Sequence, residues 1–77
     1  MSIAADEAQR LALSWLANDQ WEPAVTKVED AGDSWRIFYN NRVYVDTKAL
    51  SHQLAGNRPV LVHKHTGSVE LDIAWRP

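Results

Sequence analysis

The fold of this chain turns on residues 54–69, which read LAGNRPVLVHKHTGSV. Gly56-Asn57 can adopt a positive φ at low cost, and Pro59 fixes φ at the entry to the apolar run Val60–Val62. Thr66-Gly67 then has the composition of a hairpin tip. The segment therefore predicts a shaped turn that feeds one strand, a hairpin and a second strand. It contains no obvious catalytic group.

The hairpin predicted from this segment has strands at Pro59–Lys64 and Val69–Trp75. A tip at Thr66-Gly67 would pair Val62 with Leu71 and Val60 with Ile73, and would set His63 across from Glu70. The row expected to face inward consists of Val69, Leu71, Ile73 and Trp75.

An amphipathic helix is predicted upstream, over residues Ile3–Asn18. Apolar residues recur there at helical spacing, and Asp6 and Glu7 lie in the first turn, where the helix dipole favours negative charge. Ser2 is the expected cap. The apolar positions are Ile3, Ala8, Leu11, Ala12, Trp15 and Leu16.

Two strands are predicted after the helix. Residues Ala24–Asp30 break strict alternation, which indicates a bulge or an edge position. The turn Ala31-Gly32-Asp33 follows, and Ser34–Asn40 alternates cleanly. We expect Trp35, Ile37 and Tyr39 on one face of that strand, and Arg36, Phe38 and Asn40 on the other.

The connection Asn41–Arg58 is long for so small a chain, and loops of this length are usually functional or disordered. It is predicted to hold a short extended piece at Val43–Val45 and then a short helical turn within Thr47–Leu54. Thr47 is the expected cap of that turn, and Gly56 the expected left-handed stop.

These elements predict an α+β fold in a single domain, residues 1–77. One N-terminal helix packs on a four-stranded antiparallel sheet, with a long loop containing a short helical turn between strands 2 and 3. Trp15, Trp35 and Leu71 are the expected core residues, together with Trp75.

The amino-acid composition argues against several classes of function. The 77 residues carry a net charge of −2 and no Cys, with 45% hydrophobic residues. Interspersed charges argue against a nucleic-acid partner, and the lack of Cys excludes disulfides and thiolate zinc sites and fits a reducing compartment. No segment approaches the ~20 apolar residues of a membrane helix. We expect a cytoplasmic protein with no membrane or nucleic-acid partner.

Two groups of residues invite a chemical interpretation. His63 and His65 would share a strand face with Glu70 nearby, which is a metal-ligand pattern but equally an ordinary solvated strand, and we favour the latter. Ser51-His52, with Asp46 or Asp72 as orienting carboxylates, could suggest a hydrolase. No nucleophile-elbow pattern surrounds any Ser, so we expect no enzyme, no metal and no cofactor.

The sequence offers more support for protein binding than for catalysis or metal binding. Phe38, Tyr44 and Trp21 are not readily placed in the core, and Arg42, Asn57 and Arg58 flank them in the chain. Aromatic and arginine side chains together are typical of binding hot spots. These six residues are the predicted partner contacts, although Phe38 could equally pack beneath the long loop.

The sequence also resembles a known family. Trp35–Tyr39 followed by a Tyr-containing loop, then Leu54–Asn57 with Pro59, the strand Val60–Val62 and finally Thr66-Gly67 are similar to the Immunity protein 35, or YrhB-like, family. The resemblance covers nearly the whole chain. It implies a small bacterial cytoplasmic protein that protects its host by binding a cognate toxin domain.

Two functions are therefore carried forward. In the first, loop 41–58 and the adjoining sheet edge cover the active site of the toxin. In the second, which the YrhB-like resemblance also allows, the protein is a small chaperone-like stress protein that binds unfolded chains. A toxin gene immediately upstream would favour the first, and an isolated heat-inducible gene the second.

Overall fold

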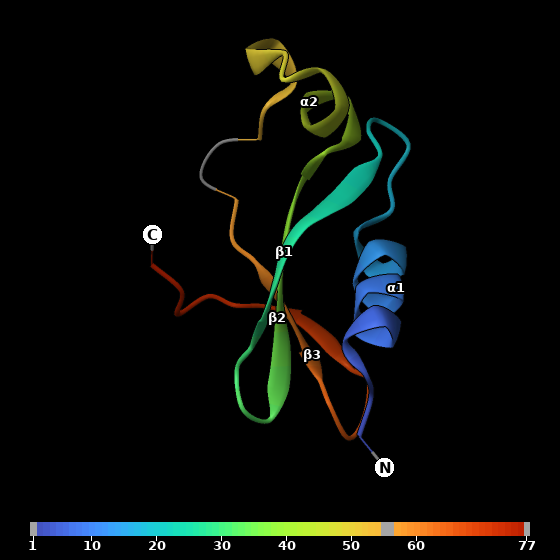
Figure 1. Ribbon diagram of the computed structural model, residues 1–77, viewed down its shortest axis with the longest axis vertical. Coiled ribbons are helices and arrows are strands. Elements are labelled where there is room, and N and C mark those ends of the chain that lie inside the picture. Colours follow the sequence, from blue (N-terminus) through green and yellow to red (C-terminus); the bar gives the residue numbers. More distant parts are fainter. Residues whose placement is uncertain (1, 55–56, 77) are drawn as a thin grey trace.

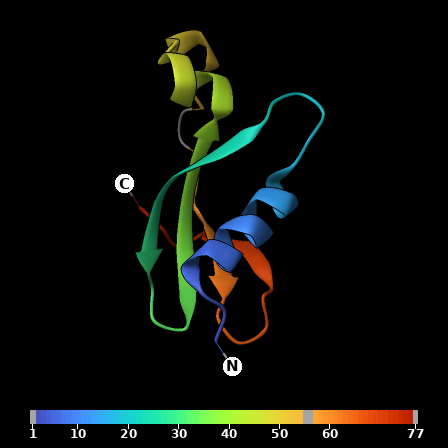
Figure 2. The same cartoon turned by 45° about the vertical axis from the view of Figure 1, so that its right-hand side comes forward.

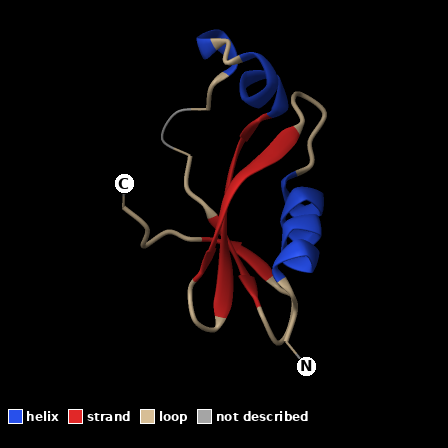
Figure 3. Ribbon diagram, viewed as in Figure 1, coloured by secondary structure: helices blue, strands red, loops and turns tan. Residues whose placement is uncertain are grey.

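The computed structural model describes residues 2–54 and 57–76 (Figure 1). Its elements in chain order are α1 (Ala5–Leu16), β1 (Pro23–Asp30), β2 (Ser34–Asn41), α2 (Arg42–Thr47), the 3₁₀ turn η1 (Leu50–His52), β3 (Val60–His63) and β4 (Val69–Leu71). The strands form one antiparallel sheet in the order β1-β2-β3-β4 (Figure 3). The predicted α+β fold is confirmed.

The helix α1 covers one face of the sheet, and the chain beyond β4 runs away on the opposite side. Figures 1 and 2 show this arrangement from two directions, with α2 at one end of a molecule whose principal extents are 40 × 24 × 18 Å. The face of the sheet turned away from α1 is called the outer face below.

The helix begins later than predicted because the chain before it is hydrogen-bonded to the connection between β3 and β4. Ala4, not Ser2, stands at its N-terminal cap, with no side-chain cap hydrogen bond. The N–H of Ile3 instead donates to the carbonyl oxygen of Lys64 at 2.7 Å. After Leu16 the Asn18 side chain accepts from the backbone of Gln20 and Trp21, so the chain turns where the helix was expected to continue.

The β1–β2 hairpin is the longest part of the sheet. Its register shifts between Val25 and Lys27, which confirms the predicted bulge, and Gly32 in the connecting turn has φ +84°. β3 pairs only with residues 34–37 of β2. The sheet therefore has four strands at one end, while residues 38–41 of β2 pair with β1 alone.

The core lies between α1 and the four-stranded end. Its fully buried members are Ala8 and Ala12 of α1, Ile37 of β2, and Val60 and Val62 of β3. Trp35 packs against them as predicted, and its Nε1–H donates to the carbonyl oxygen of Ile3 at 2.8 Å. The two helix alanines allow α1 to approach the sheet closely.

The predicted register of the second hairpin is wrong by two residues. Val62 pairs with Val69, and Val60 with Leu71, because the N–H of His63 bonds to Ser68 across a four-residue loop. β4 ends at Leu71, where the N–H of Asp72 donates to the carbonyl oxygen of Pro59.

Two expected core residues are exposed. Leu71 lies on the uncovered edge strand and is 44% exposed, and Trp15 is 48% exposed on α1. Ile73, expected in the inward row, is 76% exposed beyond the end of β4. Trp75, also expected in the core, packs on the outer face.

The predicted extended piece at Val43–Val45 is also wrong, since these residues form the middle of α2. The Asn41 side chain caps this helix by accepting from the N–H of Val43 at 2.9 Å. Thr47 is its last residue, not the cap of the next turn, and Lys48 closes it at φ +59°. The predicted helical turn is present as η1, and the expected left-handed position at Gly56 lies outside the described residues.

Candidate partner-binding groove

A groove of about 450 Å³ opens on the outer face, beside the point where β3 stops pairing with β2. Its walls come from β1, β2, the segment before β3 and the chain after β4. The lining residues are Thr26, Phe38, Tyr39, Asn57, Arg58, Pro59, Trp75 and Arg76. Three of the six predicted partner contacts, Phe38, Asn57 and Arg58, therefore lie in one groove.

The apolar wall of the groove is an aromatic pair. The rings of Phe38 and Trp75 meet edge to face, with centroids 5.6 Å apart and planes at 74°. The Lys27 ammonium lies 5.4 Å from the Phe38 ring centroid. Phe38 points outward because it alternates with the buried Ile37, and Trp75 reaches it because the chain crosses to the outer face after β4.

Arg58 fastens the chain after β4 to the segment before β3. Its Nη1 donates to the carbonyl oxygen of Ile73 at 3.0 Å and to that of Trp75 at 2.8 Å. Asn57 fixes the same segment to β2, because its Nδ2 donates to the carbonyl oxygen of Tyr39 at 2.9 Å. The next residue, Pro59, is fully buried. The groove is therefore held by hydrogen bonds on both sides.

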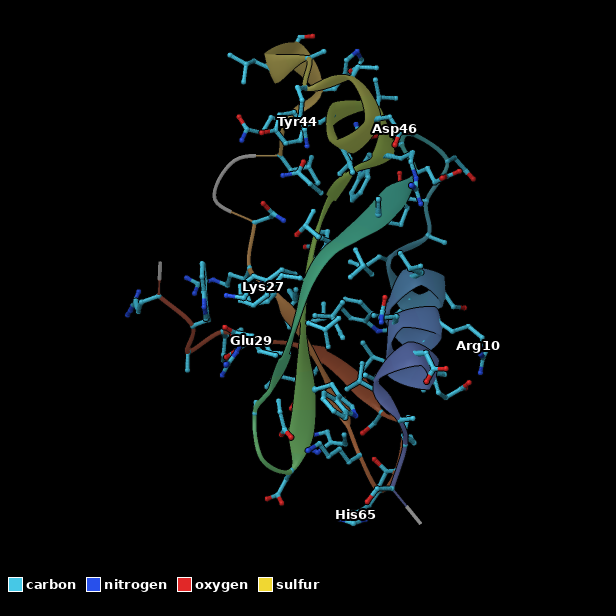
Figure 4. All side chains as sticks on the ribbon, viewed as in Figure 1. Arg10, Lys27, Glu29, Tyr44, Asp46 and His65 are labelled. Carbon is cyan, nitrogen blue, oxygen red and sulfur yellow. The ribbon has the colours of Figure 1, made fainter. Side chains whose placement is uncertain are left out.

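Ion pairs surround the groove on the outer face. Arg36 Nε lies 2.9 Å from Asp72 Oδ2, and Arg36 Nη1 lies 3.3 Å from Glu29 Oε1. Lys27 Nζ lies 3.0 Å from Glu29 Oε2. The pairing with Asp72 raises the pKa of the Arg36 guanidinium, and hydrogen bonds from Lys27 and then Arg36 lower the pKa of Glu29. Figure 4 shows Lys27 and Glu29 on the side of the sheet away from α1.

The other predicted contacts lie elsewhere. Arg42 and Tyr44 are on α2 at the end of the molecule, where Arg42 Nε pairs with Glu22 Oε2 at 3.2 Å and the Lys48 ammonium lies 5.6 Å from the Tyr44 ring (Figure 4). Trp21 stacks on Tyr39 with ring centroids 6.4 Å apart, in the connector between α1 and β1. The structure therefore does not gather all six residues in one place.

Sequence reasoning missed the contribution of Trp75, Thr26 and Arg76 to the groove. Trp75 was placed inside because the predicted strand continued through it with apolar alternation. The available signal was Asp72, a carboxylate in the middle of the predicted strand. Its 6% exposure and its pair with Arg36 mark the place where the chain leaves the sheet.

The histidine considered for metal binding, His63, lies between a serine and a carboxylate. His63 Nε2 lies 3.2 Å from Glu70 Oε1, so the expected nearness of these two residues is observed, and Ser34 Oγ lies 3.4 Å from His63 Nδ1, a contact that sequence spacing did not suggest. Ser34 is buried, however, and the groove does not include it. Within residues 2–54 and 57–76 no three His, Cys, Asp or Glu side chains are grouped to hold a metal ion. No helix in the same ranges has the length and apolar character to cross a membrane.

The structure is an α+β fold in which the N-terminal helix α1 packs on a four-stranded antiparallel sheet, with a groove of aromatic and arginine side chains on the other face. Residues 6–75 match the sequence model of the family described as Immunity protein 35. The match covers most of the chain, and the protein belongs to that family. Comparison with curated proteins gave no match, and neither did comparison with solved structures.

Proposed function

We propose that this protein is an immunity protein that binds a cognate bacterial toxin domain and covers its active site. Membership of the Immunity protein 35 family is the observation that carries the proposal. The name of that family describes a protein that confers immunity, and we infer that it does so by inhibition without catalysis. Inhibition by covering an active site requires shape and affinity but no catalytic group. The cytoplasm of the toxin-producing cell is where such protection is needed.

The proposed toxin-binding surface has two parts, the groove and α2. The groove contributes Phe38, Asn57 and Arg58, and α2 contributes Arg42 and Tyr44. Segment 48–58 joins the two parts along the chain. Aromatic and arginine side chains dominate binding energy in protein interfaces, and each such anchor can be worth about 2 kcal/mol or more. Trp21 supports this surface from the other side of the sheet through its stacking on Tyr39.

The size of the molecule is sufficient for such an interface. A standard protein–protein interface buries about 800 Å² on each partner, and the accessible surface of this protein is 5062 Å². A cytosolic inhibitor has to outcompete substrate, which calls for nanomolar binding, about −12 kcal/mol. Exposed large apolar side chains among the described residues are distributed over α1, α2, η1, β4 and the segment after it, and are not gathered in one element. The structure therefore gives no particular support to the chaperone-like alternative.

The test uses the toxin domain encoded beside the gene for this protein. Coexpression with the wild-type protein should restore growth to cells that produce the toxin, and calorimetry should give nanomolar affinity. Tyr44→Ala and Arg58→Ala should each weaken binding about thirtyfold, the equivalent of 2 kcal/mol. Arg10→Ala is the matched control, because Arg10 lies on the solvent side of α1 (Figure 4).

Two results would contradict the proposal. If coexpression does not restore growth and calorimetry detects no complex, the protein is not an immunity protein for that toxin. Wild-type affinity in both Tyr44→Ala and Arg58→Ala, together with loss of binding in Arg10→Ala, would move the interface to α1.

A further inference from the structure

We propose that the outer-face groove recognises an acidic side chain that stands next to an apolar side chain on the partner protein. Arg58 and Arg76 bind the carboxylate, and the Phe38–Trp75 pair receives the apolar neighbour. The inference follows from the charge around the groove, the hydrogen bonding of Arg58 and the composition of the walls.

The charge around the groove is locally positive, although the whole chain carries −2. Lys27 and Arg36 are matched by Glu29 and Asp72, with which they form ion pairs. Arg58 and Arg76 line the groove, and neither forms an ion pair with any other residue in the ranges 2–54 and 57–76. The groove therefore carries an excess of two guanidinium groups, which favours an acidic occupant and disfavours a basic one.

The guanidinium of Arg58 is already oriented before any partner arrives. Its Nη1 holds the carbonyl oxygens of Ile73 and Trp75, at 3.0 and 2.8 Å. The hydrogen bonds found among the described residues do not use its Nε or Nη2. Because the guanidinium is planar, two fixed bonds on one nitrogen set the direction of the remaining N–H groups. The Nε–Nη2 edge presents two parallel donors, the geometry that binds a carboxylate with both oxygens.

The walls explain why an apolar residue should accompany the acid. Phe38 and Trp75 are half-buried and meet edge to face, so an aliphatic or aromatic side chain can pack on their remaining surface. A volume of about 450 Å³ lies within the range of sites that hold small ligands, about 300 to 1,000 Å³. A protruding loop of the partner can therefore place side chains in it. Apolar surroundings also strengthen the attraction between guanidinium and carboxylate.

That the acidic segment belongs to the toxin rests on the proposed function. The preference of the groove for a carboxylate is independent of the proposed function. This preference is therefore tested with peptides and without any toxin. The probe is a blocked pentapeptide, acetyl-Gly-Leu-Glu-Leu-Gly-amide. Its matched control has Gln in place of Glu and therefore has the same shape without the charge.

Binding is followed by ¹⁵N–¹H NMR titration of the full chain. The Glu peptide should shift the backbone amides of Phe38, Asn57 and Arg58 and the Nε–H of Arg58, and should bind at least tenfold more tightly than the Gln peptide. Arg58→Gln and Arg76→Gln should each reduce that ratio at least threefold. Arg76→Gln is informative even if Arg58→Gln loosens the chain after β4, because Arg76 is exposed. Arg10→Gln, on α1, should leave the ratio unchanged.

Equal affinities for the two peptides would overturn the inference, as would shifts confined to α1 or α2. An unchanged ratio in both arginine variants would do the same, as would the absence of any shift with the Glu peptide at millimolar concentration. A toxin that fails to bind the wild-type protein leaves these peptide results intact. Failure of the proposed function and failure of this inference are thus distinguishable.

Discussion

The side-chain amide of Asn40 pairs with the backbone of Leu54 as one strand pairs with another. Its Oδ1 accepts from the N–H of Leu54 at 2.8 Å, and its Nδ2 donates to the carbonyl oxygen of Leu54 at 3.3 Å. Asn57 makes a single bond of this kind from the other segment, because its Nδ2 donates to the carbonyl oxygen of Tyr39 at 2.9 Å. Along residues 38–41 of β2, where β3 does not pair, these two asparagine side chains connect β2 to the segment before β3.

Replacing Asn40 by Ala should therefore release the segment that leads from η1 to the groove. A buried N–H left without an acceptor costs about 1–3 kcal/mol, and the N–H of Leu54 is part-buried, so the free energy of unfolding should fall by roughly 1 kcal/mol. Hydrogen exchange at the Leu54 amide should accelerate more than that at Val62, in the core. Equal protection of Leu54 in the wild type and the variant would contradict this role of Asn40.

The Arg36–Asp72 pair should stabilise the fold much more than the exposed Arg42–Asp46 pair. Asp72 is 6% exposed, and Asp72→Ala would leave Arg36 without its main partner, a loss of about 2 kcal/mol in urea denaturation. Asp46 lies 3.8 Å from Arg42 on the surface, so Asp46→Ala should change stability by less than about 0.5 kcal/mol. Equal effects of the two substitutions would show that burial of Asp72 does not matter.

Truncating Ile37 should destabilise the protein more than truncating Trp15, although Trp15 has the larger side chain. Ile37 is fully buried, and Ile37→Ala should cost about 2–5 kcal/mol and unfold much of the protein at 37 °C. Trp15 is 48% exposed, so Trp15→Ala should cost about 1 kcal/mol or less. Circular dichroism melting curves measure both, and a larger loss for Trp15→Ala would place the core elsewhere.

Acid should weaken the fold through the carboxylates at the end of β1. The pKa of Asp30 is lowered by its hydrogen bonds with Lys64 and then with the N–H of Gly32, and the pKa of Glu29 is lowered as described above. A lowered folded-state pKa stabilises the protein above the unfolded values of 3.8 and 4.5, and this stability is lost as the pH falls through the folded pKa. The melting temperature should therefore be level near pH 6 and fall below about pH 4.5.

Asp30→Asn is the matched test of that pH dependence. Asn keeps an oxygen that can accept from Gly32 but has no titrating group, so the melting temperatures of variant and wild type should converge as the pH falls to 3. A constant difference between the two curves would exclude Asp30 as a source of the acid sensitivity.

Lys48 offers a route to a more stable protein. It closes α2 at φ +59°, a conformation that costs an L-residue roughly 1 kcal/mol relative to Gly. Lys48→Gly should raise the free energy of unfolding by about 0.5–1 kcal/mol, reduced by the lost contact of the ammonium with Tyr44. Lys48→Ala is the control, because it removes the same ammonium without relieving the backbone. The variant with Gly should melt above the variant with Ala.

The elements with strong local patterns were predictable from the sequence. The spacing of Ala8 and Ala12 gave α1, and the alternation of Trp35 and Ile37 gave β2, because a single buried face imposes each period. The bulge in β1 was visible as broken alternation at Val25 and Val28. These features depend on near neighbours in the chain, and the structure confirms all of them.

The errors arise where a distant or unusual contact overrides local preference. Val43–Val45 has the composition of a strand, but the Asn41 cap and the hydrogen bond from Thr47 Oγ1 to the carbonyl oxygen of Val43 stabilise one short helix. The chain leaves the sheet at Asp72, whose side chain accepts a hydrogen bond from Arg36, 36 residues away in the sequence. The grouping of Phe38, Asn57 and Arg58 in a groove was missed because Trp75 was placed on the wrong face.

The absence of any buried residue in α2 has a consequence for how the family can diversify. The helix adds no side chain to the core, which lies at the other end of β2. Substitutions on α2, part of the proposed toxin-binding surface, should therefore have little effect on whether the protein folds. If α2 contacts the toxin as proposed, partner choice and foldability depend on opposite ends of the molecule, so new specificities can arise without compensating changes in the core.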